Sequence, residues 1–162
     1  MDDGGPREGR ARPVTRERGG PRESSNGGVM AGVLVVDDDP DVQFVVGLVL
    51  KRFGHDVVMA ASGQAALEIA AREMPDAVIL DWVMPGMAGP EVCRRLRAMP
   101  GGDRVAVMML TVRVGEEDME AAFRAGVDDY MMKPFGHEEF MARVESMLAR
   151  VAQPGSGRDR RS

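Results

Sequence analysis

The octapeptide Val-Leu-Val-Val-Asp-Asp-Asp-Pro at residues 33–40 carries the strongest structural signal in this chain. Four consecutive apolar residues, three of them β-branched, are typical of a strand that is buried on both faces, as strands of parallel sheets are. Asp39 followed by Pro40 predicts a helix N-cap and a first helical position, where proline is well tolerated. We therefore predict a buried strand that runs through an acidic turn into a helix.

The same alternation of a short apolar run with a longer helical segment recurs four times after this octapeptide. The predicted strands are residues 33–36, 56–59, 77–80, 105–110 and 127–131. Strands that alternate with helices predict a parallel sheet with crossover connections. The expected fold is therefore α/β, with a five-stranded parallel sheet that is doubly wound and has helices on both faces.

Helix boundaries and helix faces follow from local signals. Ser62 is the predicted N-cap of the second helix, Pro90 opens the third, and Gly126 ends the fourth. The predicted inner face of the first helix is Val42, Val45, Val46, Val49 and Phe53, and that of the fifth is Phe140, Met141, Val144, Met147, Leu148 and Val151.

Both ends of the 162-residue chain differ in composition from its middle. Residues 1–30 hold seven Gly, three Pro and six Arg with few apolar residues, and residues 153–162 repeat that bias. Such segments bury too little surface to offset the entropy of ordering, so we expect disordered tails at 1–30 and 153–162. One domain is then expected at 31–152, and Met30 is an alternative start to Met1.

Charge and apolar content exclude several classes of protein. The whole chain has a formal charge of −5, and residues 31–152, with 12 basic and 20 acidic side chains, have −8. This acidity argues against direct nucleic-acid binding. No run approaches the ~18 apolar residues of a membrane span, and no signal peptide is recognisable. The single cysteine, Cys93, fits a reducing compartment, so we expect a cytoplasmic protein without membrane insertion.

Polar groups gather where the predicted strands end. The first strand ends in Asp37 and Asp38, the third in Asp81, the fourth in Thr111, and the fifth leads to Lys133. Ligands of doubly wound sheets bind beyond these carboxyl ends. Close carboxylates repel one another, and oxygen ligands without His or Cys favour Mg²⁺. The pattern predicts phosphoryl transfer, with Asp81 as a nucleophile that forms an acyl phosphate.

The choice of lysine at position 133 supports this interpretation. The chain uses 19 Arg and only two Lys, Lys51 and Lys133. A compact ammonium group enters a tight phosphate site as a point charge, whereas a planar guanidinium is bulkier. We therefore expect Lys133 to neutralise phosphoryl oxygens.

Four motifs in this order resemble the response regulator receiver domains of two-component signalling. They are Val-Leu-Val-Val-Asp-Asp-Asp-Pro at 33–40, Val-Ile-Leu-Asp-Trp-Val-Met-Pro-Gly-Met-Ala-Gly at 78–89, Met-Leu-Thr at 109–111 and Asp-Asp-Tyr-Met-Met-Lys-Pro-Phe at 128–135. The resemblance runs from Val33 to Val151. It implies a flavodoxin-like sheet with strand order 2-1-3-4-5, similar to that of single-domain chemotaxis regulators.

The resemblance also implies roles at the acidic cluster. Asp81 would be the phosphoacceptor, and its phosphoryl group would come from a histidine kinase or a phosphotransfer protein. Asp38, Asp81 and the backbone carbonyl of Val83 would ligate Mg²⁺ directly, and Asp37 through water. The chain would then be a phosphoacceptor switch rather than an enzyme, limited to its own phosphorylation and dephosphorylation.

A switch follows from the same resemblance. Thr111 and Lys133 would bind the phosphoryl group, Thr111 and Tyr130 would form the switch pair, and the Lys133–Pro134 peptide bond would be cis. The surface of the fourth helix, fifth strand and fifth helix would change and bind a downstream target protein. Only ten residues follow the fifth predicted helix, so we expect no covalent output domain in this chain.

Two other functions stay open at this point. A small aspartyl-phosphate hydrolase or transferase would use the same nucleophile, although such phosphatases typically have a second Asp at the position of Val83. A phosphate-independent, receiver-like scaffold is the other alternative. The chain has no Gly-x-Gly-x-x-Gly after its first strand and no Gly-rich loop ending in Lys-Ser/Thr, which disfavours nucleotide enzymes.

The cysteine, the two histidines and two methionines near Asp81 are not expected to take part in the chemistry of the site. We expect Cys93 to be a small core residue and His55 and His137 to be solvated near turns, without a partner histidine at metal-ligand spacing. Met84 and Met87, in the loop after Asp81, are expected to form an adaptable binding surface.

Overall fold

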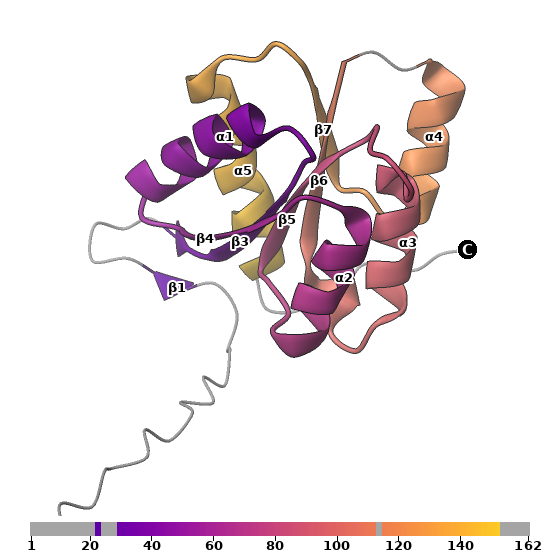
Figure 1. Cartoon of the computed structure of the whole chain (residues 1–162). Helices are drawn as coiled ribbons and strands as arrows, with labels where there is room; N and C mark the ends of the chain where they lie inside the picture. The colour runs from indigo at the N-terminus through magenta and orange to yellow at the C-terminus, as the bar shows by residue number, and fades with distance from the viewer. Residues whose placement is uncertain (1–21, 24–28, 113–114, 153–162) are drawn as a thin grey trace, which may run out of the picture.

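Five parallel strands form the central sheet. The computed structural model describes residues 22–23, 29–112 and 115–152. The strands are β3 (Gly32–Val36), β4 (Asp56–Ala60), β5 (Ala77–Asp81), β6 (Ala106–Thr111) and β7 (Asp129–Met132). They lie in the order β4-β3-β5-β6-β7, which confirms the predicted order 2-1-3-4-5 (Figure 1).

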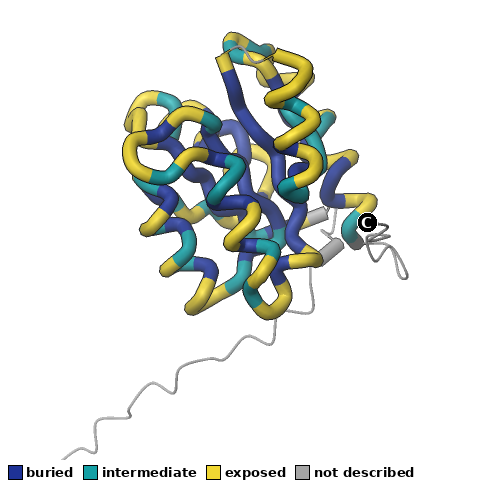
Figure 2. Tube along the Cα trace, turned by 90° about the vertical axis from the view of Figure 1, so that its right-hand side faces the viewer, coloured by how far each residue is buried: buried dark blue, intermediate teal, exposed yellow. Residues whose placement is uncertain are grey.

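Helices cover both faces of this sheet. They are α1 (Pro40–Arg52), α2 (Gly63–Arg72), α3 (Gly89–Ala98), α4 (Glu116–Ala125) and α5 (His137–Ala152), with a short 3-10 helix, η1 (Gly102–Arg104), before β6. The core between the sheet, α1 and α5 is separate from the core beneath α2, α3 and α4. Figure 2 shows buried strands enclosed by helices that are exposed on their outer sides. Within the described ranges, no helix is long and apolar enough to cross a membrane.

The predicted helix signals are confirmed. Asp39 caps α1, because its side chain accepts a hydrogen bond from the Asp41 N–H at 2.9 Å. Ser62 caps α2 in the same way through the Ala65 N–H. Gly126 ends α4 with a φ of 106°, a left-handed conformation that glycine adopts without strain.

The inner face of α1 was predicted only in part. Val42, Val46 and Val49 pack into the core, but Val45 is 42% exposed and Phe53 is 52% exposed. The helix approaches the sheet through Gly47, where a Cβ would lie 2.2 Å from Cε of Met59. Because consecutive helical residues differ by about 100° in direction, this contact turns Val45 towards solvent. Phe53 is the C-cap, beyond the last helical residue.

The prediction that His55 is solvated is wrong. The side chain is only 4% exposed, and its Nδ1 accepts a hydrogen bond from the Ala31 N–H at 3.1 Å. The chain reverses at Gly54, with a φ of 86°, and brings the imidazole beneath the start of β3. His137 is exposed and Cys93 is buried, as predicted.

The predicted tails lie mostly outside the described residues. Within 1–30, the structure describes β1 (Arg22–Glu23) and β2 (Val29–Met30), which pair as a two-stranded antiparallel sheet. The sequence did not predict these strands. Residues 153–162 and the rest of 1–30 are outside the described ranges.

Candidate functional site

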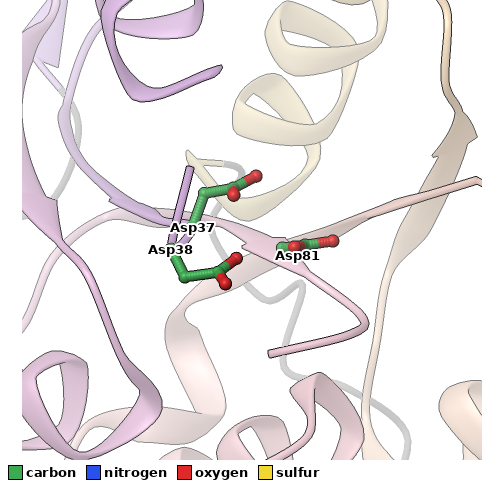
Figure 3. A group of neighbouring side chains, drawn as sticks. All are labelled: Asp37, Asp38 and Asp81. Atoms are coloured by element: carbon green, nitrogen blue, oxygen red, sulfur yellow. The ribbon is translucent and has the colours of Figure 1, made fainter. Parts of the chain in front are cut away.

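Three carboxylates converge at the carboxyl end of the sheet. Asp37 and Asp38 follow β3, and Asp81 is the last residue of the neighbouring strand β5. Figure 3 shows the three side chains directed into one small region, and their carboxylate oxygens lie within 4.8 Å of one another. Asp37 and Asp81 are only 1% and 9% exposed, whereas Asp38 faces solvent. The predicted acidic cluster therefore forms in three dimensions.

Hydrogen bonds to its backbone and side chain hold Asp37 in place. Its N–H donates to the Ala60 carbonyl at 3.1 Å, and its Oδ1 accepts from the Asp39 N–H at 2.9 Å. The side chain of Gln43 donates to the carbonyl of Asp37 at 2.6 Å and to that of Ala60 at 3.2 Å. Gln43 thus braces the acidic turn from α1. The sequence does not predict this contact, because no spacing rule links a glutamine to a carbonyl six residues earlier.

Lys133 lies between the two buried carboxylates. Its Nζ is 3.2 Å from Oδ2 of Asp37 and 3.5 Å from Oδ1 of Asp81. The backbone N–H of Lys133 donates to the Thr111 carbonyl at 2.7 Å, and the Lys133–Pro134 bond is cis, as the resemblance implies. One ammonium group and the three carboxylates of the cluster leave an excess of negative charge, which a bound cation would offset.

The ionised form of Asp81 is disfavoured in this surrounding. Burial raises the pKa of Asp81, and the charge of Asp37 raises it further. The charge and hydrogen bond of Lys133, and then the backbone N–H of Val83, act in the opposite direction. A divalent cation would favour the carboxylate, and the donor set, which consists of oxygen atoms alone, fits a hard ion such as Mg²⁺.

The predicted switch residues lie on β6 and β7, the two strands that follow β5 in the sheet. Thr111 is the buried last residue of β6, and it pairs with Met132 of β7. Tyr130 lies two residues before Met132 and is half-buried against the core beneath α2, α3 and α4. Its ring meets that of Phe123 on α4 edge to face, with centroids 6.1 Å apart. Strands β6 and β7 therefore connect the carboxylate site with the α4 surface.

The loop after Asp81 borders a surface hollow of about 540 Å³. Met87 lines it, together with the N-terminal residues Ser62 and Gly63 of the α2 region and with Glu91 and Arg95 of α3. Met84, in contrast, is buried, so the prediction that it forms part of an adaptable surface is wrong. Val83 is exposed beside the site.

The chain is similar to known proteins over most of its described length. Residues 33–145 match the family model described as response regulator receiver domain. Response regulator MprA of Mycobacterium leprae is 42% identical over 119 residues, which are 74% of this chain and 51% of that protein. This chain therefore spans about half the length of the curated relatives it matches.

Two solved structures are similar in both sequence and fold. Chemotaxis protein CheY4 of Vibrio cholerae is 30% identical, with a TM-score of 0.71, over 74% of this chain and 99% of that one. The receiver domain of sensor histidine kinase PA1611 from Pseudomonas aeruginosa is 31% identical, with a TM-score of 0.68, over 74% and 98%. The latter structure contains a magnesium ion coordinated in its active site cleft.

Proposed function

This chain belongs to the response regulator receiver domain family, and on this basis we propose that it is a Mg²⁺-dependent phosphorelay switch with Asp81 as the phosphoacceptor. The observation that carries the proposal is the position of Lys133, whose Nζ contacts both Asp37 and Asp81. A nucleophilic carboxylate, a metal-binding pair of acids and a phosphate-binding cation are thus within reach of one transferred group.

The donor is a phosphohistidine of a histidine kinase or phosphotransfer protein. A carboxylate oxygen of Asp81 forms a bond to phosphorus while the bond between phosphorus and the imidazole nitrogen breaks, and the electron pair of that bond returns to the imidazole. Lys133 and Thr111 neutralise and hydrogen-bond the oxygens of the transferred group. The chain needs no turnover of a substrate, so its role is that of a switch rather than an enzyme.

Asp38, Asp81 and the Val83 carbonyl are the proposed direct ligands of Mg²⁺, with Asp37 bound through water. The oxygen-only donor set and the excess negative charge around Lys133 support this assignment. When bound, the ion supplies positive charge to the phosphoryl oxygens and to Asp81. The magnesium ion in the related receiver domain from Pseudomonas aeruginosa also supports it.

The output is a change of the α4-β7-α5 surface. Thr111 and Tyr130 form the switch pair. Thr111 is the last residue of β6 and brings its hydroxyl to the site, and the ring of Tyr130 contacts Phe123 on α4. Phe123 and Met132 are exposed apolar side chains on this surface and are suited to contact a target protein. We further propose that the described domain acts in the cytoplasm, without membrane insertion or direct nucleic-acid contact.

A phosphodonor experiment tests this function. Trp82 is the only tryptophan of the chain and follows Asp81 directly, so its fluorescence reports on the site. We expect Mg²⁺ to change the emission, and acetyl phosphate with Mg²⁺ to change it further and to add one phosphoryl group to the intact mass. Asp81→Asn should abolish the mass increase, whereas Asp103→Asn, an exposed substitution on η1, should leave it intact.

Other outcomes favour the alternatives. An Asp81→Asn variant that still gained a stable phosphoryl group would remove Asp81 from its role. Sustained hydrolysis of phosphomonoesters would identify a hydrolase. If the wild-type chain accepts no phosphoryl group from acetyl phosphate or from a phosphorylated histidine donor, the phosphate-independent scaffold is the alternative that remains.

A further inference from the structure

The side chain of Arg97, at the end of α3, binds four residues in two segments, 102–105 and 126–128. Its guanidinium donates to the Gly126 carbonyl through Nε at 3.1 Å and through Nη2 at 2.7 Å. Nη1 donates to the carbonyls of Gly102 at 2.6 Å and Val105 at 2.5 Å. Nη2 also pairs with Oδ2 of Asp128 at 3.1 Å. The side chain is 11% exposed, so these bonds are largely shielded from water.

Asp128 extends this network into the sheet. Its Oδ2 accepts a hydrogen bond from the Val107 N–H at 2.7 Å, and its own N–H donates to the Val107 carbonyl at 2.8 Å. The residue before β7 is therefore fixed both to Arg97 and to β6.

The end of α4 is shaped to receive the guanidinium. Gly126 has a positive φ, and a Cβ at this position would lie 2.8 Å from Nε of Arg97. Its carbonyl belongs to the negative, C-terminal end of α4, where a cation is favoured. The glycine is thus required both by the turn and by the contact with Arg97.

This anchor lies at the end of α4 that is remote from Asp81. Strand β6 ends beside the site, and α4 begins at the same end of the sheet. The helix then runs back over about 15 Å to the amino ends of the strands, where β7 begins (Figure 1). Phe123 and Tyr130, whose rings are in contact, lie on either side of the anchored residues 126–128. Arg97 therefore holds the distal ends of the two elements that carry the proposed output surface.

We propose that Arg97 is a positioning residue that acts as the fixed pivot of the switch. This inference rests on the proposed function. With the distal ends of α4 and β7 held by charged, shielded hydrogen bonds, a change at Asp81 displaces the ends near the site and turns the Phe123–Tyr130 pair as a unit. Without the pivot, the distal ends of α4 and β7 move as well, and the phosphorylated chain adopts several conformations of the output surface instead of one.

The test compares Arg97→Lys with wild type, each with and without acetyl phosphate and Mg²⁺. Lysine keeps the charge but has only three N–H donors for the five hydrogen bonds that the guanidinium makes. Arg94→Lys is the matched control, because Arg94 lies on the same helix, is exposed and pairs with Glu91. Intact mass measures phosphorylation. Hydrogen exchange measures the protection of the backbone amides of residues 116–119 and 124–128. The NMR resonances of the ring of Tyr130, the only tyrosine, report changes in the output surface.

In wild type and Arg94→Lys, we expect phosphorylation to change exchange at 116–119, to leave 124–128 unchanged and to shift the Tyr130 resonances. Arg97→Lys should be phosphorylated equally well, but its phosphorylation-dependent change should extend to 124–128, and most of the Tyr130 shift should be lost. If exchange at 124–128 rises equally with and without phosphorylation and the Tyr130 shift persists, Arg97 is only structural and the inference is overturned.

Two further outcomes separate this inference from the proposed function. A wild-type chain that takes up no phosphoryl group contradicts both. If Arg97→Lys does not fold, Asp128→Asn replaces it, since this change preserves size and weakens one partner of the guanidinium. An Asp128→Asn variant that is phosphorylated and keeps the wild-type exchange pattern and Tyr130 shift would overturn the pivot role alone.

Discussion

Neutralising Asp81 should stabilise the folded chain when no divalent cation is present. Burial and the charge of Asp37 raise the pKa of Asp81, so folding disfavours its ionised form at neutral pH. Lys133 compensates this only in part. Because asparagine has nearly the same shape without the charge, Asp81→Asn should relieve the unfavourable interaction and leave Lys133 paired with Asp37.

The size of the effect follows from the distances at the site. At 4.8 Å, the limit of the cluster, and an effective dielectric constant near 20, repulsion between Asp37 and Asp81 is about 3.5 kcal/mol. Attraction between Lys133 and Asp81 at 3.5 Å is about 4.7 kcal/mol on the same scale. Burial of the charge costs several kcal/mol more, so the expected net gain for Asp81→Asn is about 1–2 kcal/mol. For a domain of this size, 1 kcal/mol raises Tm by about 4 °C.

Thermal unfolding of wild type, Asp81→Asn and the exposed control Asp103→Asn, first with EDTA and then with Mg²⁺, measures this difference. With EDTA, Asp81→Asn should have the highest Tm and Asp103→Asn that of wild type. At a Mg²⁺ concentration ten times its Kd, wild type should gain about 1.4 kcal/mol, and Asp81→Asn less, so that the gap closes. A lower Tm for Asp81→Asn with EDTA, or equal gains from Mg²⁺, would refute the electrostatic argument.

Three other substitutions test the site and the core. Lys133→Arg should slow phosphoryl uptake from acetyl phosphate, measured by intact mass, because the planar guanidinium does not fit between two carboxylates placed for an ammonium group; uptake at the wild-type rate would contradict this. Burial lowers the pKa of His55 from its ordinary value of 6.5, so the unfolded chain takes up the proton first. The free energy of unfolding should therefore fall as pH decreases from about 7.5 to about 5.5, and denaturant titrations should find a weaker pH dependence of this free energy in His55→Gln. Gly126→Ala should lower stability by about 1–3 kcal/mol, because alanine is strained at a φ of 106° and its Cβ meets Arg97; an unchanged midpoint in denaturant would contradict the proposed fit.

Local chemistry explains why much of the fold could be predicted. The run of residues 33–36 is apolar throughout because its strand is covered on both faces, and the caps at Asp39, Ser62 and Gly126 satisfy backbone groups within a few residues of themselves. Such signals depend on near neighbours in the chain. The convergence of Asp37, Asp81 and Lys133 could also be anticipated, since the carboxyl ends of parallel strands meet at one edge of a sheet.

Contacts between distant segments could not be anticipated in this way. Val45 and Val46 have the same chemistry, and the approach of Gly47 to Met59 turns one of them outwards. His55 is buried against Ala31, in the segment before the neighbouring strand, whose N–H donates a hydrogen bond to it.

The amino-acid sequence thus specifies the alternation of strands and helices, the caps and the identity of the acidic site, because each depends on short-range hydrogen bonding or on hydrophobic periodicity. The brace of Gln43 on the acidic turn and the anchoring of α4 and β7 by Arg97 arise only on folding. A glutamine or an arginine acquires such a role when packing brings carbonyls from distant segments to its donors, and no pattern along the chain encodes which carbonyls these are.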